Sequence, residues 1–277
     1  VMPRQLPAMI RVELLKVFTQ WSGIGAVFMA VLVPLATLGV LYIFGGSSVS
    51  SSVQGQAVTS MIHFDVVGAT GWALYARNFI ILPLMLILAT GASVAGEQSD
   101  RTLRELVVRP VPRWSVLVAK QVSLWALSVV TLVVTLAVSV GLGWIIFGAP
   151  SVDPAVAEGE ESLIRVLFAF GVCFFSDVAL IALATAFSTF VRSVGGVVVS
   201  LALVLLTDRA LWAFLSLLEF FKVEWAPTAV QFTLVSVLGA WSHWANEYVP
   251  IQFVECFALF AAAWALSIAR FSRTDVP

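Results

Sequence analysis

The sequence is poor in charged residues, cysteine and histidine, and this excludes several classes of site. Only 11% of its 277 residues are Asp, Glu, Lys or Arg, and it has two cysteines and two histidines. Cys173 and Cys256 both fall inside apolar runs, so neither a disulfide framework nor a metal cluster is expected. No lysine follows a glycine-rich phosphate-binding loop, so we expect no nucleotide site of that kind.

Hydrophobic length is what the sequence has in abundance. Its hydrophobic fraction is 60% and its mean hydropathy +1.01, above the roughly 45–50% apolar content of soluble domains. A helix that crosses the hydrocarbon needs about 20 mostly apolar residues. The runs of that length are 21–44, 79–96, 121–147, 166–190, 194–221 and 251–269. The sequence therefore predicts an all-α, polytopic integral membrane protein with one transmembrane domain over residues 21–277.

The positions of the basic residues predict the orientation, because loops rich in Lys and Arg stay in the cytoplasm. With both termini inside, most of the 15 Lys and Arg residues are cytoplasmic. Arg77, Arg165 and Lys222 are then outside, Arg77 within an outer loop over 45–78. The aromatic second half of that loop is expected to be ordered at the interface. We expect a multi-pass protein of the plasma (inner) membrane with both termini in the cytoplasm.

Two segments outside the spans also have an expected structure. Residues 1–20 read as an amphipathic interfacial helix, with Ile10, Leu14, Val17 and Phe18 on one face. The alternative is a solvated tail. The apolar run 227–241 is too short to cross, so we expect a re-entrant or interfacial segment.

A charged stretch between the second and third spans is the most informative feature. Over 97–120 it forms a cytoplasmic loop in which Thr102 and Glu105 have the spacing of a helix capping box. Leu103 and Leu106 fall on one face of that short helix, and Pro110 ends it. An exposed helix of this kind favours a docking surface for a protein partner. The alternative is an ordinary charged loop with its apolar face on lipid.

The same stretch resembles a known family. The pattern G-E, T-L-x-E-L and R-P-V-x-R-W, followed by a lysine at the next span, is similar to the first cytoplasmic loop of ABC-2-type, exporter-class ABC transporter permeases. In that family the loop is a coupling helix that seats in a groove of the ATP-binding subunit. The sequence departs from the family at Asp100 and Arg101, where a glycine is common. The matching residues are Glu97, Thr102, Leu103, Glu105, Leu106, Arg109, Pro110, Val111, Arg113 and Lys120.

The resemblance implies a division of labour between subunits. This chain would be the transmembrane permease, with no catalytic residues and no cofactor of its own. Two ATP-binding subunits would hold ATP and Mg, and a second permease chain would complete a homodimer in the lipid bilayer. Export is expected, an extracytoplasmic accessory protein is compatible with the family, and no nucleic-acid partner is expected. The substrate stays open.

Three charged residues fall within the predicted spans. Asp177 lies near the middle of the fourth span, and Asp208 and Arg209 near the middle of the fifth. An unpaired charge there costs roughly 2.5–3.5 kcal/mol or more, so each needs a partner or water. Asp177 is the expected partner of Arg209, because adjacent helical residues point about 100° apart. These residues form either a polar lining for a translocation route or an ion pair that fixes helix register.

Other readings of the charged residues remain open. A stand-alone, ion-coupled secondary transporter or channel would use Asp177 and Asp208, but it leaves the exposed helix at Leu103 unexplained. The motif E-E-x-x-x-R from Glu160 to Arg165 occurs in intramembrane prenyl-type proteases, but it falls here in an outer loop. No metal site is expected. One built from His63, Asp65 and His243 would need two distant segments to meet.

Overall fold

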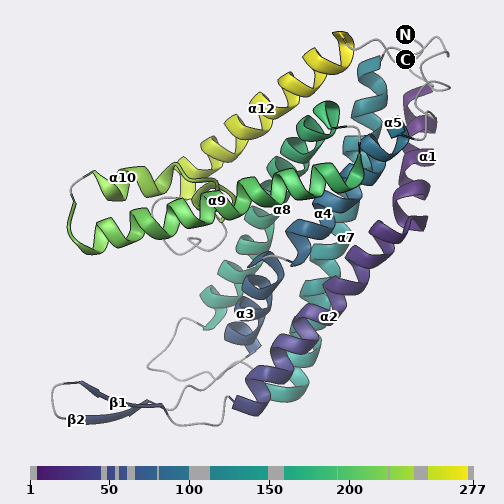
Figure 1. Cartoon of the computed structure of the whole chain (residues 1–277). Helices are drawn as coiled ribbons and strands as arrows, with labels where there is room; N and C mark the ends of the chain where they lie inside the picture. The colour runs from purple at the N-terminus through teal and green to yellow at the C-terminus, as the bar shows by residue number, and fades with distance from the viewer. Residues whose placement is uncertain are drawn as a thin grey trace.

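Helices dominate the part of the chain that the computed structural model describes, which is residues 5–44, 49–53, 56–60, 66–79, 81–99, 113–148, 159–191, 193–223, 225–239 and 249–273. Six of these helices are long and apolar enough to cross a membrane, at Trp21–Ile43, Ile81–Ser99, Trp114–Phe147, Leu167–Phe190, Val194–Phe220 and Phe253–Phe271. Each overlaps one predicted run, which confirms the all-α, polytopic membrane class. The elements (Figure 1) are α1 (Gln5–Thr19), α2 (Trp21–Phe44), β1 (Val49–Val53), β2 (Gln56–Ser60), α3 (Val66–Phe79), α4 (Ile81–Gly91), the π-helix η1 (Ala92–Gly96), α5 (Glu97–Ser99), α7 (Arg113–Phe147), α8 (Gly159–Phe190), α9 (Val194–Phe220), α10 (Ala226–Gln231), α11 (Leu234–Leu238) and α12 (Val249–Arg273).

The chain between α2 and α4 differs from the predicted outer loop. Its first half contains an antiparallel hairpin, in which Val49 pairs with Ser60 and Val53 with Gln56. Its second half is α3, which packs against α2, α7 and α8. Arg77 therefore lies in a helix with its side chain buried, and the prediction that it sits in an outer loop is wrong. The helix contains polar residues such as Thr70 and Arg77, which make it resemble a loop by hydropathy, but these two are buried because the inner side of α3 contacts other helices.

Helices α1 and α2 join through a tight bend at Gln20. The backbone N–H of Gln20 donates to the Lys16 carbonyl at 2.9 Å, so the helical bonding continues almost to the bend. A Cβ added to Gly23 would overlap the carbonyl oxygen of Val17, so the bend requires glycine at this position. Before the bend, α1 lies along α7, and Val17 is buried. The amino-terminal helix α1 is thereby packed against the third predicted span.

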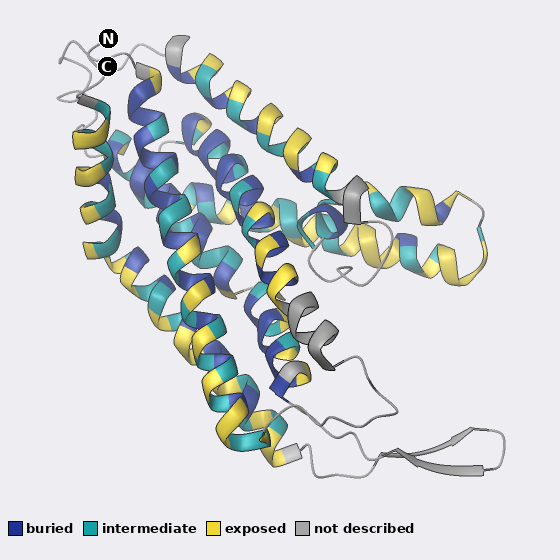
Figure 2. Cartoon of the chain, turned by 180° about the vertical axis from the view of Figure 1, so that it is seen from behind, coloured by how far each residue is buried: buried dark blue, intermediate teal, exposed yellow. Residues whose placement is uncertain are grey.

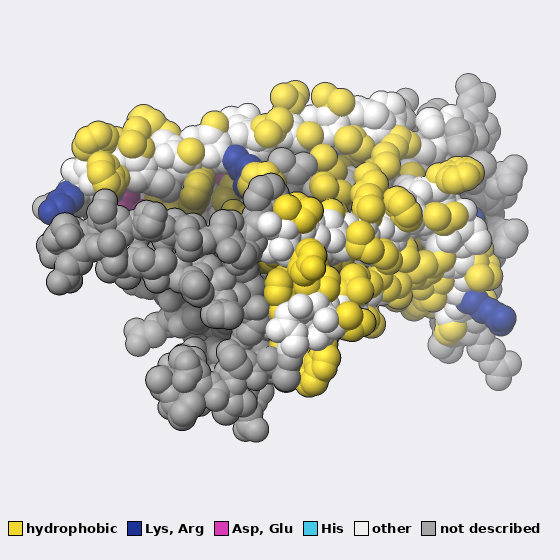
Figure 3. Space-filling view, turned by 90° about the horizontal axis from the view of Figure 1, so that it is seen from below, with side chains coloured by type: hydrophobic (Ala, Val, Ile, Leu, Met, Phe, Trp, Pro, Cys, Tyr) yellow, Lys and Arg dark blue, Asp and Glu magenta, His cyan; other side chains and the backbone are white. Residues whose placement is uncertain are grey.

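Helices α8, α9 and α12 form the other side of the bundle. Helix α12 runs along α8, whereas α9 crosses the bundle at a steep angle (Figure 1). The segment predicted to be re-entrant, 227–241, contains the short helices α10 and α11; α10 packs on α9, and α11 contacts α8, α9 and α12. Buried residues gather in the central helices and exposed ones on the outer helices (Figure 2). Seen from the end with the hairpin, many of the described side chains are hydrophobic (Figure 3).

The two ends of the bundle carry different elements. The start of α1, helix α5, the start of α7 and the end of α12 lie together at one end, and the hairpin projects from the other (Figure 1). Both flanks of the segment 100–112 therefore lie at the same end of the molecule. The functional residues described next begin there.

Candidate functional site

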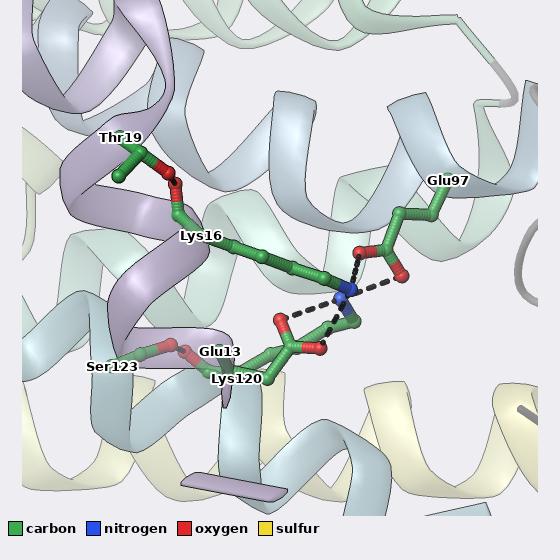
Figure 4. A network of polar contacts seen from close by, with 6 residues as sticks. All are labelled: Glu13, Lys16, Thr19, Glu97, Lys120 and Ser123. Carbon is green, nitrogen blue, oxygen red and sulfur yellow. Dashed lines mark hydrogen bonds and ion pairs between the residues drawn. The ribbon is translucent and has the colours of Figure 1, made fainter. Parts of the chain in front are cut away.

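Four charged side chains from three helices form a cluster where α5 ends and α7 begins. Glu13 and Lys16 come from α1, Glu97 from α5 and Lys120 from α7 (Figure 4). The Nζ of Lys120 lies 3.0 Å from Glu13 Oε2 and 2.8 Å from Glu97 Oε2. The Nζ of Lys16 lies 3.3 Å from Glu13 Oε1 and 3.1 Å from Glu97 Oε1. Each lysine thus bridges both glutamates, and we call these four residues the ion cluster.

The ion cluster is buried on one side and open on the other. The side chains of Lys120 and Glu13 are 2% and 7% exposed, whereas that of Lys16 is 40% exposed. Burial acts to lower the pKa of Lys16, but the charges and hydrogen bonds of Glu13 and Glu97 outweigh it and raise that pKa. Removing one member of a buried ion pair typically costs about 3–5 kcal/mol, because the remaining charge is left without a partner. The loss of Glu13 or of Lys120 would therefore leave the other one buried with fewer opposite charges and would destabilise the fold.

Local sequence explains how each helix delivers its residues to the cluster. Glu13 and Lys16 are three positions apart, which places them on the same side of α1. Glu97 follows the π-helical turn Ala92–Gly96, and the extra residue in such a turn shifts every later side chain around the axis by about 100°. Ser99 Oγ donates to the Gly96 carbonyl at 2.7 Å and holds the short helix that follows. The π-helical turn thus sets the direction in which Glu97 points.

The predicted coupling residues are only partly within the described chain. Glu97 is described and belongs to the ion cluster, and Arg113 begins α7 without a described side chain. Thr102, Leu103, Glu105, Leu106, Arg109 and Pro110 lie outside the described residues, so their coupling role stays a prediction. The sequence alone did not join Glu13, Lys16, Glu97 and Lys120 into one site. The one hint in the sequence was that these four residues, two acidic and two basic, all lie next to apolar runs.

A second polar network lies inside the bundle, around Asp177 of α8. Arg77 Nη2 donates to Asp177 Oδ2 at 2.8 Å, and Ser128 Oγ donates to the same oxygen at 2.6 Å. Arg77 also donates to Asn78 Oδ1 at 2.6 Å and to Thr131 Oγ1 at 3.2 Å. The Arg77 side chain is fully buried. The prediction that Asp177 pairs with Arg209 is therefore wrong: α3 supplies a cation closer to Asp177 than α9 does.

Asp208 and Arg209 on α9 contact two different elements. Asp208 Oδ1 accepts from the Leu234 N–H at 3.0 Å, and its Oδ2 accepts from the Val235 N–H at 2.7 Å. Arg209 Nη2 donates to the Phe79 carbonyl at 2.7 Å, and its guanidinium carbon lies 4.8 Å from the centre of the Phe79 ring. Asp208 thus caps α11, and Arg209 connects α9 to the end of α3.

Comparison with known families decides the identity of the chain. The family model described as "ABC-2 family transporter protein" matches residues 9–207, which is more than half of the sequence. The chain belongs to the ABC-2 transporter family. It is thus a multi-pass membrane permease subunit of an ABC transporter, as the residues from 96 to 121 predicted. A comparison with curated proteins finds no match.

The family match divides the functional residues of the permease. It includes the whole ion cluster, the segment 100–112 and the pair Arg77–Asp177. It ends at residue 207, so Asp208, Arg209 and the helices α10 to α12 lie beyond it. Of the residues in the metal and protease readings, His63, Asp65 and His243 lie outside the described part. Glu160, Glu161 and Arg165 lie in α8 rather than in the expected outer loop, and their side chains are not described.

Proposed function

We propose that the permease is an exporter subunit driven by ATP hydrolysis in separate ATP-binding subunits. In this proposal the segment from Glu97 to Arg113 is the surface on which the ATP-binding subunit acts. Leu103 and Leu106 fill an apolar groove of that subunit, and Thr102, Glu105, Arg109 and Pro110 shape the short helix that carries them. Family membership supports a partner of this kind, and the resemblance of the segment to a coupling helix supports its location.

The observation that carries the proposal is the position of the ion cluster. Glu97 lies just before the segment 100–112, and Lys120 lies in the first part of α7 after it. Both residues bond to Glu13 or Lys16 of α1, directly or through each other. A displacement of the segment would therefore pull on α1, on the helix ending at α5 and on α7 together. In this proposal, a displacement of the segment 100–112 by the ATP-binding subunit moves α1, α5 and α7 together through the ion cluster.

The working complex that follows from this role contains more than one chain. We propose two ATP-binding subunits and a second copy of the permease as a homodimer, with ATP and Mg held by the partner and no cofactor held by this chain. One end of the bundle holds α1, α5 and the end of α12 (Figure 1). We propose that this end lies on the cytoplasmic side of the plasma membrane, because ATP is available there. An extracytoplasmic accessory protein fits the projecting hairpin end.

Site-specific crosslinking tests the docking surface directly. A photoreactive phenylalanine analogue at Leu103 should crosslink to an ATP-hydrolysing polypeptide in membranes, whereas the same analogue at the exposed Lys222 should not. In the purified complex, Leu103→Glu with Leu106→Glu should reduce ATP hydrolysis stimulated by the permease by about tenfold or more, because charges would enter an apolar groove. Normal membrane insertion of the variant is the control. Full stimulation of ATP hydrolysis by the double variant, together with the absence of a crosslink from Leu103, would contradict the proposal.

The rival function, a stand-alone ion-coupled transporter, uses Asp177 and Asp208 as its coupling groups. Both carboxylates already have strong partners, since Asp177 bonds to Arg77 and Ser128 and Asp208 bonds to two backbone N–H groups. An ion would have to displace these contacts. Reconstitution of the chain alone in vesicles decides between the two: flux under an imposed proton or sodium gradient without nucleotide would favour the rival.

A further inference from the structure

A cavity between five helices has no part in the coupling described above. It has a volume of about 390 Å³ and lies between α3, α4, α8, α9 and α11. Its size falls within the range of roughly 300–1,000 Å³ that is typical of small-molecule sites. Most of its wall is apolar, and Leu180, Leu205, Leu206 and Trp212 provide much of it. The cavity therefore suits a ligand with a long apolar part.

The charged groups that line the cavity are not balanced against each other. Asp177 lines it, but its charge is already compensated by Arg77 at 2.8 Å. Arg209 also lines it, and among the described residues no carboxylate pairs with Arg209. The neighbouring Asp208 directs both oxygens at the N–H groups of α11. A positive charge that no described carboxylate pairs with thus faces a largely apolar space.

Arg209 is held in a fixed direction while keeping donors for a ligand. The bond from its Nη2 to the Phe79 carbonyl and its position over the Phe79 ring fix the guanidinium against α3. A guanidinium carries five N–H donors in a planar fork that matches carboxylate and phosphate. Among the described residues only the Phe79 carbonyl takes one of these donors, which leaves the others for an anion. An arginine within a span is costly without a counter-charge, and a bound anion would remove that cost.

We propose that this cavity binds an anionic amphiphile. Its carboxylate or phosphate lies on Arg209, and its apolar tail lies along Leu180, Leu205, Leu206 and Trp212. The inference rests on the proposed function in one respect: if the permease exports its substrate, the cavity names the chemical class of that substrate. Two sources supply this chemistry, an acidic lipid of the bilayer and a free amphiphile delivered for export, and the experiment below distinguishes them.

Equilibrium binding to the full chain in phosphatidylcholine nanodiscs tests the site. Radiolabelled dodecyl phosphate should bind with a measurable affinity that falls by about tenfold or more in Arg209→Gln, because a charge-assisted contact is lost. Binding of uncharged dodecanol should be weak and the same in both proteins. Arg270→Gln is the matched control, since Arg270 also lies over a phenylalanine ring, at 5.2 Å from that of Phe190, but does not line the cavity.

A second variant tests the part of the cavity that holds the apolar tail of the amphiphile rather than its charged headgroup. Ala202 lines the cavity, and Ala202→Phe should fill it and abolish binding of both dodecyl phosphate and dodecanol. Arg209→Lys should restore part of the affinity for dodecyl phosphate, because it keeps the charge. Binding of dodecyl phosphate by a folded Arg209→Gln, or by Ala202→Phe, that equals binding by the wild type would overturn the proposal. An ill-folded Arg209→Gln protein would leave Ala202→Phe as the deciding variant.

Two further measurements identify the source of the amphiphile and separate this inference from the proposed function. Competition by phosphatidylglycerol would assign the site to a bilayer lipid, and stimulation of ATP hydrolysis in the complex by dodecyl phosphate would assign it to an exported substrate. Either result supports the anionic site. Binding in nanodiscs needs no ATP-binding subunit, so its failure leaves the crosslink at Leu103 intact, and failure of that crosslink leaves binding intact.

Discussion

Arg77 and Asp177 are separated by one hundred positions in the sequence, and they form an ion pair of 2.8 Å in the interior of the bundle. The pair joins α3 to α8, and Ser128 of α7 donates to the same carboxylate oxygen. Three helices therefore meet at one carboxylate. Because both charges are buried, each is stable only in the presence of the other.

Substitution of Asp177 by Asn should destabilise the permease by about 3–5 kcal/mol, because a fully buried guanidinium loses its counter-charge. The measurement is the midpoint of thermal unfolding in detergent micelles. The double variant Arg77→Met with Asp177→Leu should recover most of that loss, since apolar residues of similar size need no partner. A midpoint unchanged by Asp177→Asn would show that the pair does not hold the bundle together.

Exchange of two charges within the ion cluster should be tolerated where either change alone is not. Glu97→Lys would bring three cations together, and Lys120→Glu three carboxylates, whereas the double variant restores two of each sign. We expect each single variant to lose permease-stimulated ATP hydrolysis about tenfold or more and the double variant to regain most of it. Purified complexes provide the measurement.

The matched control for this exchange is Glu219→Lys, at the end of α9. Glu219 is exposed, so its substitution should change stability by no more than about 0.5 kcal/mol. Loss of ATP hydrolysis in both the single and the double cluster variants, without loss of folding, would mean that the identity of each residue matters rather than the pairing. That result would contradict a coupling role based on ion pairing.

Alanine at Gly23 should disturb the bend between α1 and α2. Its Cβ would overlap the Val17 carbonyl oxygen, which belongs to the backbone and has no room to move without shifting α1. We expect a loss of about 1–3 kcal/mol in the free energy of unfolding, measured by thermal denaturation. Gly39→Ala in the same helix should be neutral or stabilising, because nothing lies within 4 Å of its added Cβ. Equal behaviour of the two variants would show that the bend adapts.

The spans were largely predictable from sequence because the bilayer imposes a simple rule, that a crossing helix is apolar for about 20 residues. The predicted run 194–221 agrees closely with α9 (Val194–Phe220). Where prediction failed, polar residues were buried against protein instead of facing water. Helix α7 begins at Arg113 rather than at 121, and Ser115, Lys120 and Gln121 in its first part are buried, which hydropathy cannot detect.

The partners of charged residues were much harder to predict than the spans. Asp177 was identified as a residue in need of a cation, and that need is met, but by Arg77 rather than Arg209. The choice depends on the packing of α3 against α8, which no local pattern encodes. For Asp208 the partner is the backbone of α11, and backbone N–H groups carry no sequence signature at all.

The ion cluster contains two lysines and two glutamates, so its formal charges add to zero. A single elementary charge moved across a membrane works against the transmembrane voltage at about 2.3 kcal/mol per 100 mV. A neutral group of four that shifts as one body does no such electrical work. A joint built in this way would move equally easily in an energised and in a de-energised cell.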